Sequence, residues 1–488
     1  MRRARPRARR SRYTIFYRLS RSAVALVVLG VLVTVMLFAS VAAVRVYSFV
    51  HTVTGQELNP LQIVQQVAEP QPGTIAYKLK HGERVAVLLV GYGGDENDAP
   101  YLTDSIMAVV LDPQTHRVLM ASIPRDLIVT MDLSVGGGRW VQKINAAFEV
   151  AYLPDIICCP APQYTGRDGG GHAAEHAVGI VTGLTFDRYI GVDFHAFRDM
   201  VDALGGIDIH MDTSLHDCHY PNYGNGYLNH GVPEGWPCPN PNYGIRFPAG
   251  DYHVNGEQAL EIARSRHADE PEQSSDFGRA RRQQMIMTAI KKKATTVNGF
   301  AKAPQLMAAL EKNFKTDMSL SDMKAVYDWG QNLPDSQIVH AGVSNDNFLQ
   351  YCRRNNISGL CPQDESWGML HRFFSGAFVD PKALGERAPI QLVNGSSVAN
   401  DVDDRNTNIL DMLGFQVADP APHPSSNSSF VLDFTNGAYP QTAQWLAGYF
   451  GAQVQLADPS APAPRGQQTY GLVVLIGRDF AGRWHGSG

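Results

Sequence analysis

The sequence predicts an α/β protein that follows one membrane-spanning helix and precedes a second, smaller α/β unit. Three observations lead to this prediction. Residues 22–44 form an apolar run without a charge. From residue 85 onward, short apolar runs typical of strands alternate with helical patterns. A new strand-turn-helix pattern then begins near Pro389. The 488 residues, 44% of them apolar, suffice for roughly two or three domains and exclude a wholly disordered chain.

Charge is distributed very unevenly along the chain. Nine of the 42 Lys and Arg residues lie within residues 1–21, which contain no acidic residue. The rest of the chain contains 33 basic and 47 acidic residues, so its net charge is −14. The arginine excess before the apolar run predicts a cytoplasmic basic tail at 1–21 and an extracytoplasmic body. We therefore expect a single-pass cell-membrane protein. An acidic body excludes a general nucleic-acid partner.

The apolar run at 22–44 is long enough to cross a hydrocarbon core of about 30 Å. The alternative is a cleaved secretory signal, with small residues near Ala39 and Ala43 at the cleavage site. An uncleaved anchor is favoured because the apolar part of a signal is only about 7–15 residues long. Residues 45–80 are polar and interrupted by prolines, as expected of a stalk.

The main domain is expected at 81–345. Apolar runs at 85–91, 105–112 and 117–123 predict three early strands, with the turn signal Asp112-Pro113 between the last two. Helices are predicted at 172–184, 194–204, 255–265, 276–296, 302–313 and 319–332, and further strands at 186–192, 207–211 and 337–343. The insert 212–250, rich in Pro, Gly, Asn and Tyr, is predicted to be an ordered surface loop.

Residues 346–388 are expected to link the main domain to a second unit at 389–488. In this unit the strand 390–393 runs into the turn signal Asn394-Gly395. A helix at 401–413, a strand at 430–434, a helix at 440–450 and a strand at 472–476 follow, with a flexible loop at 457–468. The pattern predicts a small α/β domain.

Six cysteines fit an extracytoplasmic body. We expect Cys218 to pair with Cys238 and Cys352 with Cys361, although six cysteines allow 15 pairings. A zinc site at Cys218, His219 and Cys238 is the alternative, but the CxxC spacing of structural zinc sites is missing.

Basic side chains recur in four segments of the main domain. Guanidinium groups match phosphate oxygens, so the set predicts a polyanion site, whereas any single arginine is more simply a solvated surface residue. The candidates are Arg125, directly after a strand; Lys143 in KINAAF; Arg264 and Arg266 at a helix end; and Arg279 with Gln283 on one helical face, with Arg282 beside it.

Carboxylates lie near the first strands. Asp104 is in YLTDS, and Asp95 and Asp98 are in the loop GYGGDENDAP. A diphosphate substrate usually needs Mg²⁺ held by one or two carboxylates, and the alternative is that the loop is only a turn. No GxGxxG, Walker, GxSxG or HExxH motif is present.

Several segments together resemble the LytR-CpsA-Psr family of cell-envelope glycopolymer ligases. They are VAVLLVGYGG, LTDSIMAVVLDPQTHRVLMASIPRDLIV, KINAAF, YIGVDFHAFRDMVDALGGIDI, HVNGEQALEIARSR and SDFGRARRQQM, in family order across about residues 85–297. The later segments IQLVNGSS, LGFQVAD and YGLVVLIGRDF are similar to the LytR C-terminal domain often appended to such proteins.

The resemblance implies an α/β/α sandwich with a mixed central sheet and a prenyl-lipid pocket. It also implies transfer of a glycopolymer from an undecaprenyl-diphosphate carrier to peptidoglycan, with Mg²⁺. Asp104 and Arg125 would be catalytic, and Asp104 with Asp98 would hold the metal. The diphosphate would be bound by Arg125, Arg264, Arg266 and Arg279 with Gln283 in support, and Lys143 and Arg282 are further candidates.

One departure from the family pattern concerns the metal. Tyr92-Gly93-Gly94 stands where many members carry an acidic residue after the first strand, so Asp98 or Asp95 is expected to replace that carboxylate. Two other functions use the same features: a polyprenyl-diphosphate hydrolase, and a non-catalytic scaffold that binds envelope lipid or wall. The predicted membrane span and the acidic body argue against a transcription regulator.

Overall fold

The computed structural model describes residues 48, 51–52, 70–94, 99–153, 156–220, 244–274, 276–294, 314–363, 366–397, 401–422, 425–458 and 471–484. The predicted membrane span at 22–44, most of the predicted stalk and the predicted helix at 302–313 lie outside these residues. No described helix combines the length and apolar character that a bilayer crossing requires.

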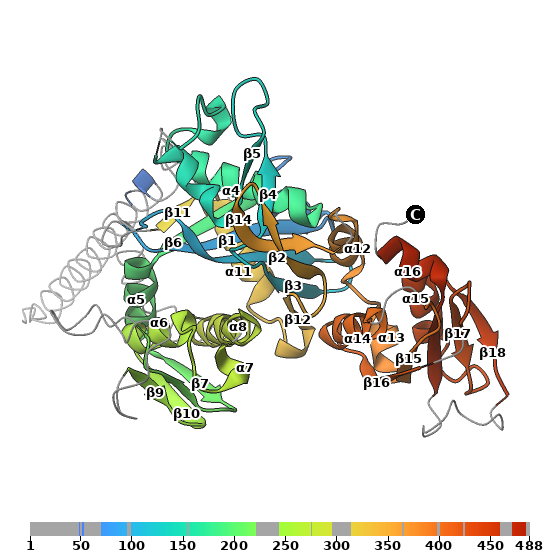
Figure 1. Ribbon diagram of the computed structural model, residues 1–488. Coiled ribbons are helices and arrows are strands. Elements are labelled where there is room, and N and C mark those ends of the chain that lie inside the picture. Colours follow the sequence, from blue (N-terminus) through green and yellow to red (C-terminus); the bar gives the residue numbers. More distant parts are fainter. Residues whose placement is uncertain are drawn as a thin grey trace, which may run out of the picture.

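A mixed six-stranded sheet forms the centre of the main domain (Figure 1). Its neighbours β1–β2, β2–β3 and β11–β6 are antiparallel, whereas β1–β6 and β3–β12 are parallel. In spatial order the strands are β11 (Phe314–Thr316), β6 (Arg188–Asp193), β1 (Val85–Tyr92), β2 (Thr103–Asp112), β3 (Arg117–Ser122) and β12 (Ile338–Gly342).

Both faces of this sheet are covered, because alternate side chains of its central strands are apolar toward each face. Leu88 and Val90 belong to the core on the side of helix α4 (Gly169–Thr182). Val85 and Val87 belong to the opposite core, with α3 (Ile75–Lys80) and α11 (Leu320–Gly330). The result is the predicted α/β/α sandwich.

Short elements connect the sheet to α4. The hairpin of β4 (Ile128–Met131) and β5 (Trp140–Lys143) is followed by the 3-10 helices η1 (Ile144–Ala146), η2 (Phe148–Ala151) and η3 (Pro162–Tyr164). The hairpin directs the end of β5 back toward the end of β3, since Ile144 N–H donates to the Leu127 carbonyl oxygen.

A separate apolar core lies beside the sheet, between α5, α6, α8 and two small strand pairs. Gly256 opens α6 where a Cβ atom would lie 2.3 Å from the Arg198 carbonyl oxygen, so glycine permits the close contact with α5. The elements are α5 (Phe194–Ala203), β7 (Ile207–Met211), β8 (Leu215–Asp217), β9 (Ile245–Phe247), β10 (Gly250–Val254), α6 (Gly256–Arg264), α7 (Pro271–Ser274) and α8 (Asp276–Ala294).

The segment 346–388 is not the simple linker that the sequence suggested. It contains the hairpin of β13 (Leu349–Arg354) and β14 (Ile357–Pro362), closed by the Cys352–Cys361 disulfide, and the helices α12 (Gly368–Gly376) and α13 (Pro381–Gly385). Phe348, Phe373 and Phe374 are buried in the main core, so this segment is packed into the fold. Cys218 is also disulfide-bonded, and Cys238 lies outside the described residues.

The C-terminal unit has its own five-stranded sheet, in the order β16-β15-β19-β17-β18, seen beside the main domain in Figure 1. It contacts the main domain through Arg405, whose Nη1 donates to the carbonyl oxygens of Asn345 (2.6 Å) and Asn347 (3.2 Å). Its elements are β15 (Pro389–Asn394), α14 (Val402–Met412), β16 (Gln416–Pro422), β17 (Phe430–Asp433), α15 (Pro440–Phe450), β18 (Gln453–Leu456), β19 (Leu472–Ile476) and α16 (Arg478–Trp484).

Candidate active site

The end of strand β3 brings a guanidinium between two carboxylates. Arg125 lies in the loop after β3, and its Nη1 forms an ion pair with Asp104 of the neighbouring strand β2. Its Nε lies 3.6 Å from the Asp126 carboxylate. The Arg125 side chain is 21% exposed and the Asp104 side chain 40%, so this pair is accessible from solvent.

Strand β5 supplies a second cation to the same place. The Lys143 ammonium lies 2.6 Å from Asp126 Oδ1. Burial acts to raise the pKa of Asp126, but the Lys143 hydrogen bond and the charges of Arg125, Lys143 and Arg266 outweigh it and lower the pKa. Asp126 is therefore ionised at neutral pH, and Arg266, although distant in sequence, is close enough to act on it.

Helix α8 closes the site from the other side. Arg279 and Gln283 line a small pocket together with Asp104, Ser105 and Ser122. The Ser105 hydroxyl donates to Gln283 Oε1 at 3.0 Å, and Gln283 Nε2 donates to the Ala263 carbonyl oxygen at 3.3 Å. Gln283 thus connects β2 to α6, while the Arg279 side chain is only 8% exposed.

Arg264 ends helix α6 and is held by aromatic rings. Its guanidinium carbon lies 4.0 Å from the centre of the Phe194 ring and 5.9 Å from that of Tyr220. Such stacking orients a guanidinium while leaving its N–H groups in the plane available to acceptors.

Arg282 has a different position from the other predicted ligands of the diphosphate. Its side chain is 3% exposed, and its three nitrogens donate to the carbonyl oxygens of Ile262, Ser265 and Gln273. Because protein oxygens already occupy these donors, we assign Arg282 a supporting role instead of direct contact with a ligand.

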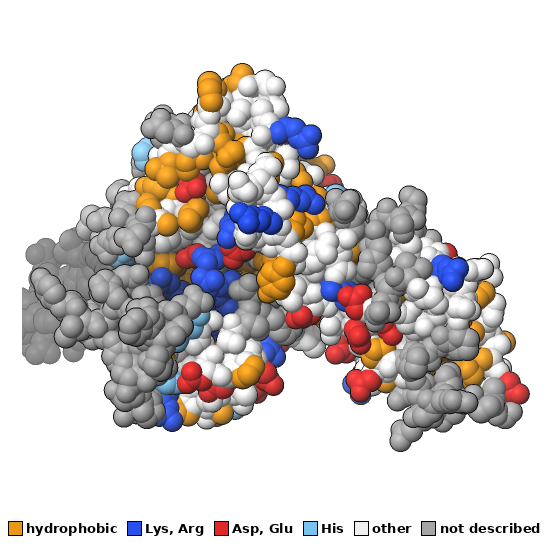
Figure 2. Space-filling model, in the orientation of Figure 1, with side chains coloured by type: hydrophobic (Ala, Val, Ile, Leu, Met, Phe, Trp, Pro, Cys, Tyr) orange, Lys and Arg blue, Asp and Glu red, His pale blue; other side chains and the backbone are white. Residues whose placement is uncertain are grey.

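Figure 2 shows Lys and Arg side chains gathered in the middle of one face of the molecule, with acidic side chains beside them. Four of the predicted cations, from four segments, lie around two carboxylates. Arg125 pairs with Asp104, and Arg279 lines the same pocket as Asp104. Lys143 pairs with Asp126, and the charge of Arg266 acts on Asp126. Four cations against two carboxylates leave an excess of positive charge, which suits a polyanionic ligand.

Among the described residues, Asp104 offers a carboxylate that suits a Mg²⁺ ion shared with a substrate. Among the described residues there is no group of three or more His, Cys, Asp or Glu side chains that could hold a metal alone. Mg²⁺ is commonly held by one or two carboxylates together with substrate phosphates, and the half-exposed Asp104 carboxylate meets that requirement. The second predicted ligand, Asp98, lies outside the described residues.

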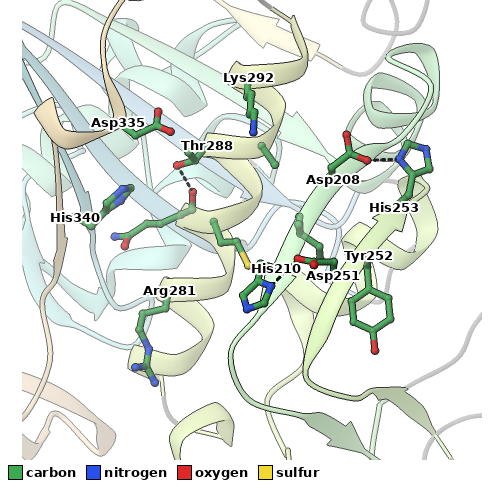
Figure 3. A pocket seen from close by; sticks show the side chains of 14 residues that line it. Asp208, His210, Asp251, Tyr252, His253, Arg281, Thr288, Lys292, Asp335 and His340 are labelled. Carbon is green, nitrogen blue, oxygen red and sulfur yellow. Dashed lines mark hydrogen bonds and ion pairs between the residues drawn. The ribbon is translucent and has the colours of Figure 1, made fainter.

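A larger cleft, of about 820 Å³, lies on the opposite face of α8 (Figure 3). In a helix of 3.6 residues per turn, Arg281, Thr288 and Lys292 point away from Arg279 and Gln283. Two histidine–aspartate pairs line this cleft: His210 with Asp251 and His253 with Asp208, each at 2.6 Å. Size alone would have selected this cleft, but its lining lacks the excess of cations over carboxylates that is found on the other face of α8.

Sequence reasoning named Arg125 and Asp104 but missed three polar residues that organise the site. Asp126 follows Arg125 directly in SIPRD, which was the available signal. No sequence pattern points to Ser105 or Asp217, because their partners Gln283 and Ser265 come from distant segments.

Comparison with known proteins identifies the family of this chain. The LytR_cpsA_psr family matches residues 51–356, which is more than half of the chain, and the chain belongs to this family. A Bacillus cereus (strain AH820) protein named polyisoprenyl-teichoic acid–peptidoglycan teichoic acid transferase TagU is 27% identical over 320 residues, covering 64% of this chain and 87% of that protein.

TagV of Bacillus subtilis is similar to this chain both in sequence and as a solved structure. The protein of strain 168 named polyisoprenyl-teichoic acid–peptidoglycan teichoic acid transferase TagV is 28% identical over 220 residues, covering 45% of this chain and 46% of that protein. The crystal structure of B. subtilis TagV superposes with a TM-score of 0.43 at 22% identity, covering 60% of this chain and 96% of that chain.

Proposed function

We propose that this protein is an extracytoplasmic phosphotransferase that attaches a glycopolymer from a polyprenyl-diphosphate carrier, the undecaprenyl form by family resemblance, to peptidoglycan. The observation that carries the proposal is the gathering of Arg125, Lys143, Arg266 and Arg279 around Asp104 and Asp126. The family membership and the activity in the names of the TagU and TagV relatives support it.

In the proposed reaction, the acceptor hydroxyl of peptidoglycan attacks the phosphorus that carries the glycopolymer. A new oxygen–phosphorus bond forms while the bridging oxygen–phosphorus bond of the diphosphate breaks. Polyprenyl phosphate leaves with the bridging oxygen, and the hydroxyl proton passes to the Asp104 carboxylate. The arginines stabilise charge on the diphosphate in both states, and more strongly as the leaving phosphate develops charge.

Arg125 has two functions in this mechanism. Its ion pair with Asp104 holds the carboxylate at the end of the site until substrate arrives, and phosphate oxygens then compete for the same N–H donors. Arg125 would thus hold Asp104 before substrate binds and bind the diphosphate afterwards.

We also propose Mg²⁺ as the cofactor, held by Asp104 with Asp98 as the second candidate ligand. When bound, Mg²⁺ would neutralise charge on the diphosphate oxygens. The cations of the chain remain necessary, because Mg²⁺ in such sites shares its coordination with the substrate.

The proposed location agrees with this chemistry. Residues 22–44 would anchor the chain in the membrane, with residues 1–21 inside the cell and the body outside. A lipid-linked diphosphate carries its own transfer energy, so the reaction needs no nucleotide outside the cell. The anchor would keep the site beside the membrane that contains the carrier lipid.

A transfer assay tests the proposed function. Full-length protein is incubated with a synthetic polyprenyl-diphosphate sugar and peptidoglycan, with and without Mg²⁺. We expect sugar phosphate bound covalently to peptidoglycan, with equal release of polyprenyl phosphate, and loss of both when Mg²⁺ is chelated. Release that continues without peptidoglycan would indicate a hydrolase, and binding without turnover would indicate a scaffold; either result contradicts transfer.

A further inference from the structure

The two arginines of the segment ARSR are separated by a serine that is completely buried. Arg264 is the last residue of α6, Ser265 caps that helix with 0% exposure, and Arg266 begins the following connection. Arg264 stacks on Phe194, and Arg266 acts on the Asp126 carboxylate. The path of the backbone at Ser265 therefore sets where both cationic side chains begin.

A buried carboxylate from a distant segment holds this turn. Asp217, at the end of β8, is 1% exposed. Its Oδ2 accepts hydrogen bonds from the Ser265 hydroxyl at 2.7 Å, from the Arg266 N–H at 3.0 Å and from the His267 N–H at 3.1 Å. Its Oδ1 accepts from the His219 N–H at 3.0 Å, so all four interactions require an acceptor.

A buried guanidinium holds the same turn from the opposite side. Arg282 Nη2 donates to the Ser265 carbonyl oxygen, and Arg282 Nε donates to that of Ile262 at 2.8 Å, one turn earlier in α6. Burial, with the nearby Arg279, lowers the pKa of Arg282 to about 10, so the group still carries its charge at neutral pH. Ser265 is thus bonded to a buried anion through its hydroxyl and to a buried cation through its carbonyl.

This way of ending a helix costs more free energy than an ordinary C-terminal cap. A glycine after the last turn closes a helix with backbone hydrogen bonds alone, whereas burial of two charged groups carries a desolvation penalty. The two charges fix the direction of the chain, since three bonds from residues 265–267 to one carboxylate oxygen leave this segment little freedom. Cys218, next to Asp217, is buried and disulfide-bonded, which anchors the carboxylate as well.

We propose that Asp217 is a positioning residue that, with Arg282 opposite, orients Arg264 and Arg266 for a prenyl-diphosphate ligand. This inference rests on the proposed function for its choice of ligand. It predicts that loss of the Asp217 bonds weakens recognition of a diphosphate more than that of a monophosphate, because two correctly spaced guanidinium groups matter most when two phosphates must be held.

The test uses the full-length protein and measures binding of farnesyl diphosphate and farnesyl monophosphate by calorimetry. Asp217→Asn replaces one acceptor oxygen by a donor group at nearly constant volume. We expect diphosphate affinity to fall at least about tenfold and monophosphate affinity less than about threefold. In the transfer assay the KM for donor should rise more than kcat falls.

Asp322→Asn is the matched control. Asp322 is also a buried carboxylate, at 0% exposure, which accepts from the Ser319 N–H and hydroxyl and from the Ala76 N–H, with Arg188 3.4 Å away. Because Asp322 belongs to the capping box of α11 and bonds neither Arg264 nor Arg266, we expect a comparable loss of thermal stability but diphosphate affinity within twofold of wild type.

A second pair of variants keeps the test decisive if Asp217→Asn does not fold. Ser265→Ala removes the hydroxyl bond to Asp217, and Ser319→Ala removes the corresponding bond to Asp322. We expect about threefold weaker diphosphate binding in Ser265→Ala and no change in Ser319→Ala.

Equal effects within either pair, or an unchanged ratio of diphosphate to monophosphate affinity, would overturn the positioning role. A wild-type protein that binds diphosphate selectively but transfers nothing would contradict the proposed function and leave the binding comparison valid. Absence of diphosphate binding in the wild type would contradict both.

Discussion

The two faces of helix α8 present different kinds of cleft. On one face, Arg279 and Gln283 contribute to a small site in which cations outnumber carboxylates. On the other face, Arg281 and Lys292 line a cleft of about 820 Å³ in which histidines and aspartates are paired at 2.6 Å. An excess of cations over carboxylates, and not volume, therefore distinguishes the site suited to a polyanion.

The largest expected effect is on the cationic face. Arg125→Ala and Arg266→Ala should each lower the transfer rate by about 100-fold or more, since each removes a charged donor aimed at the diphosphate. The initial rate of sugar transfer measures the effect, and circular dichroism melting controls for folding. Full activity in both variants would show that Arg125 and Arg266 do not bind the diphosphate, and that the two faces of α8 do not differ in function.

A smaller effect is expected for a residue that lines the large cleft but supports the fold. Gln284 is 5% exposed, and its Nε2 donates to the carbonyl oxygens of Met120 and Ala341 at 3.2 and 3.0 Å, which joins α8 to the ends of β3 and β12. Gln284→Ala should lower the free energy of unfolding by about 2 kcal/mol, because two buried acceptors lose their donor. Chemical denaturation checks this, and transfer measured well below the melting temperature should remain within about threefold of wild type.

The Lys143–Asp126 pair should give a pH-dependent stability difference. Lys143→Met should lower the free energy of unfolding at pH 7 by about 1 kcal/mol, since a half-buried carboxylate loses its closest cation. The folded-state pKa of Asp126 is lowered below its usual 3.8, so the stabilisation exists above that value and disappears as pH falls through the folded pKa.

Urea titrations of the wild type and of Lys143→Met between pH 2 and pH 7 test this sign. The two curves should converge at the acidic end. A difference that grows as the pH decreases would mean that Asp126 is not the partner that Lys143 stabilises.

The smallest effects are expected in the large cleft. His210→Gln and Lys292→Met should change transfer and donor KM by less than about twofold, because neither side chain belongs to the cationic site. Kinetics at saturating and limiting donor measure this. A decrease as large as that of Arg125→Ala would show that both faces of α8 take part in the reaction, and the comparison would have to be replaced by one extended site.

Prediction from sequence was most successful where local pattern decides structure. The runs at 85–91 and 105–112 lie within β1 and β2, and the helical pattern at 255–265 contains α6. The segment 346–388 was misjudged as a linker. The strands of this segment are short, and its phenylalanines are buried against side chains from other segments. No local sequence pattern therefore predicts that the segment is part of the main fold.

The site shows the same division. Arg125, Arg266 and Arg279 could be proposed from residue chemistry and motif resemblance, whereas Arg282 could not be separated from them, because its burial depends on how α6 and α8 pack. Asp217 gave no signal at all, since its four donors come from residues up to 50 positions away or from its own turn.

The sequence by itself determined the α/β class, the family membership suggested by its motifs and the types of residue available for binding a diphosphate. These follow from side-chain periodicity and chemistry, which are properties of neighbouring residues. Only the tertiary structure decided which basic residues line the candidate site and which are buried against backbone carbonyl oxygens. That decision depends on burial and on hydrogen-bond partners from distant segments, and both exist only once the chain has folded.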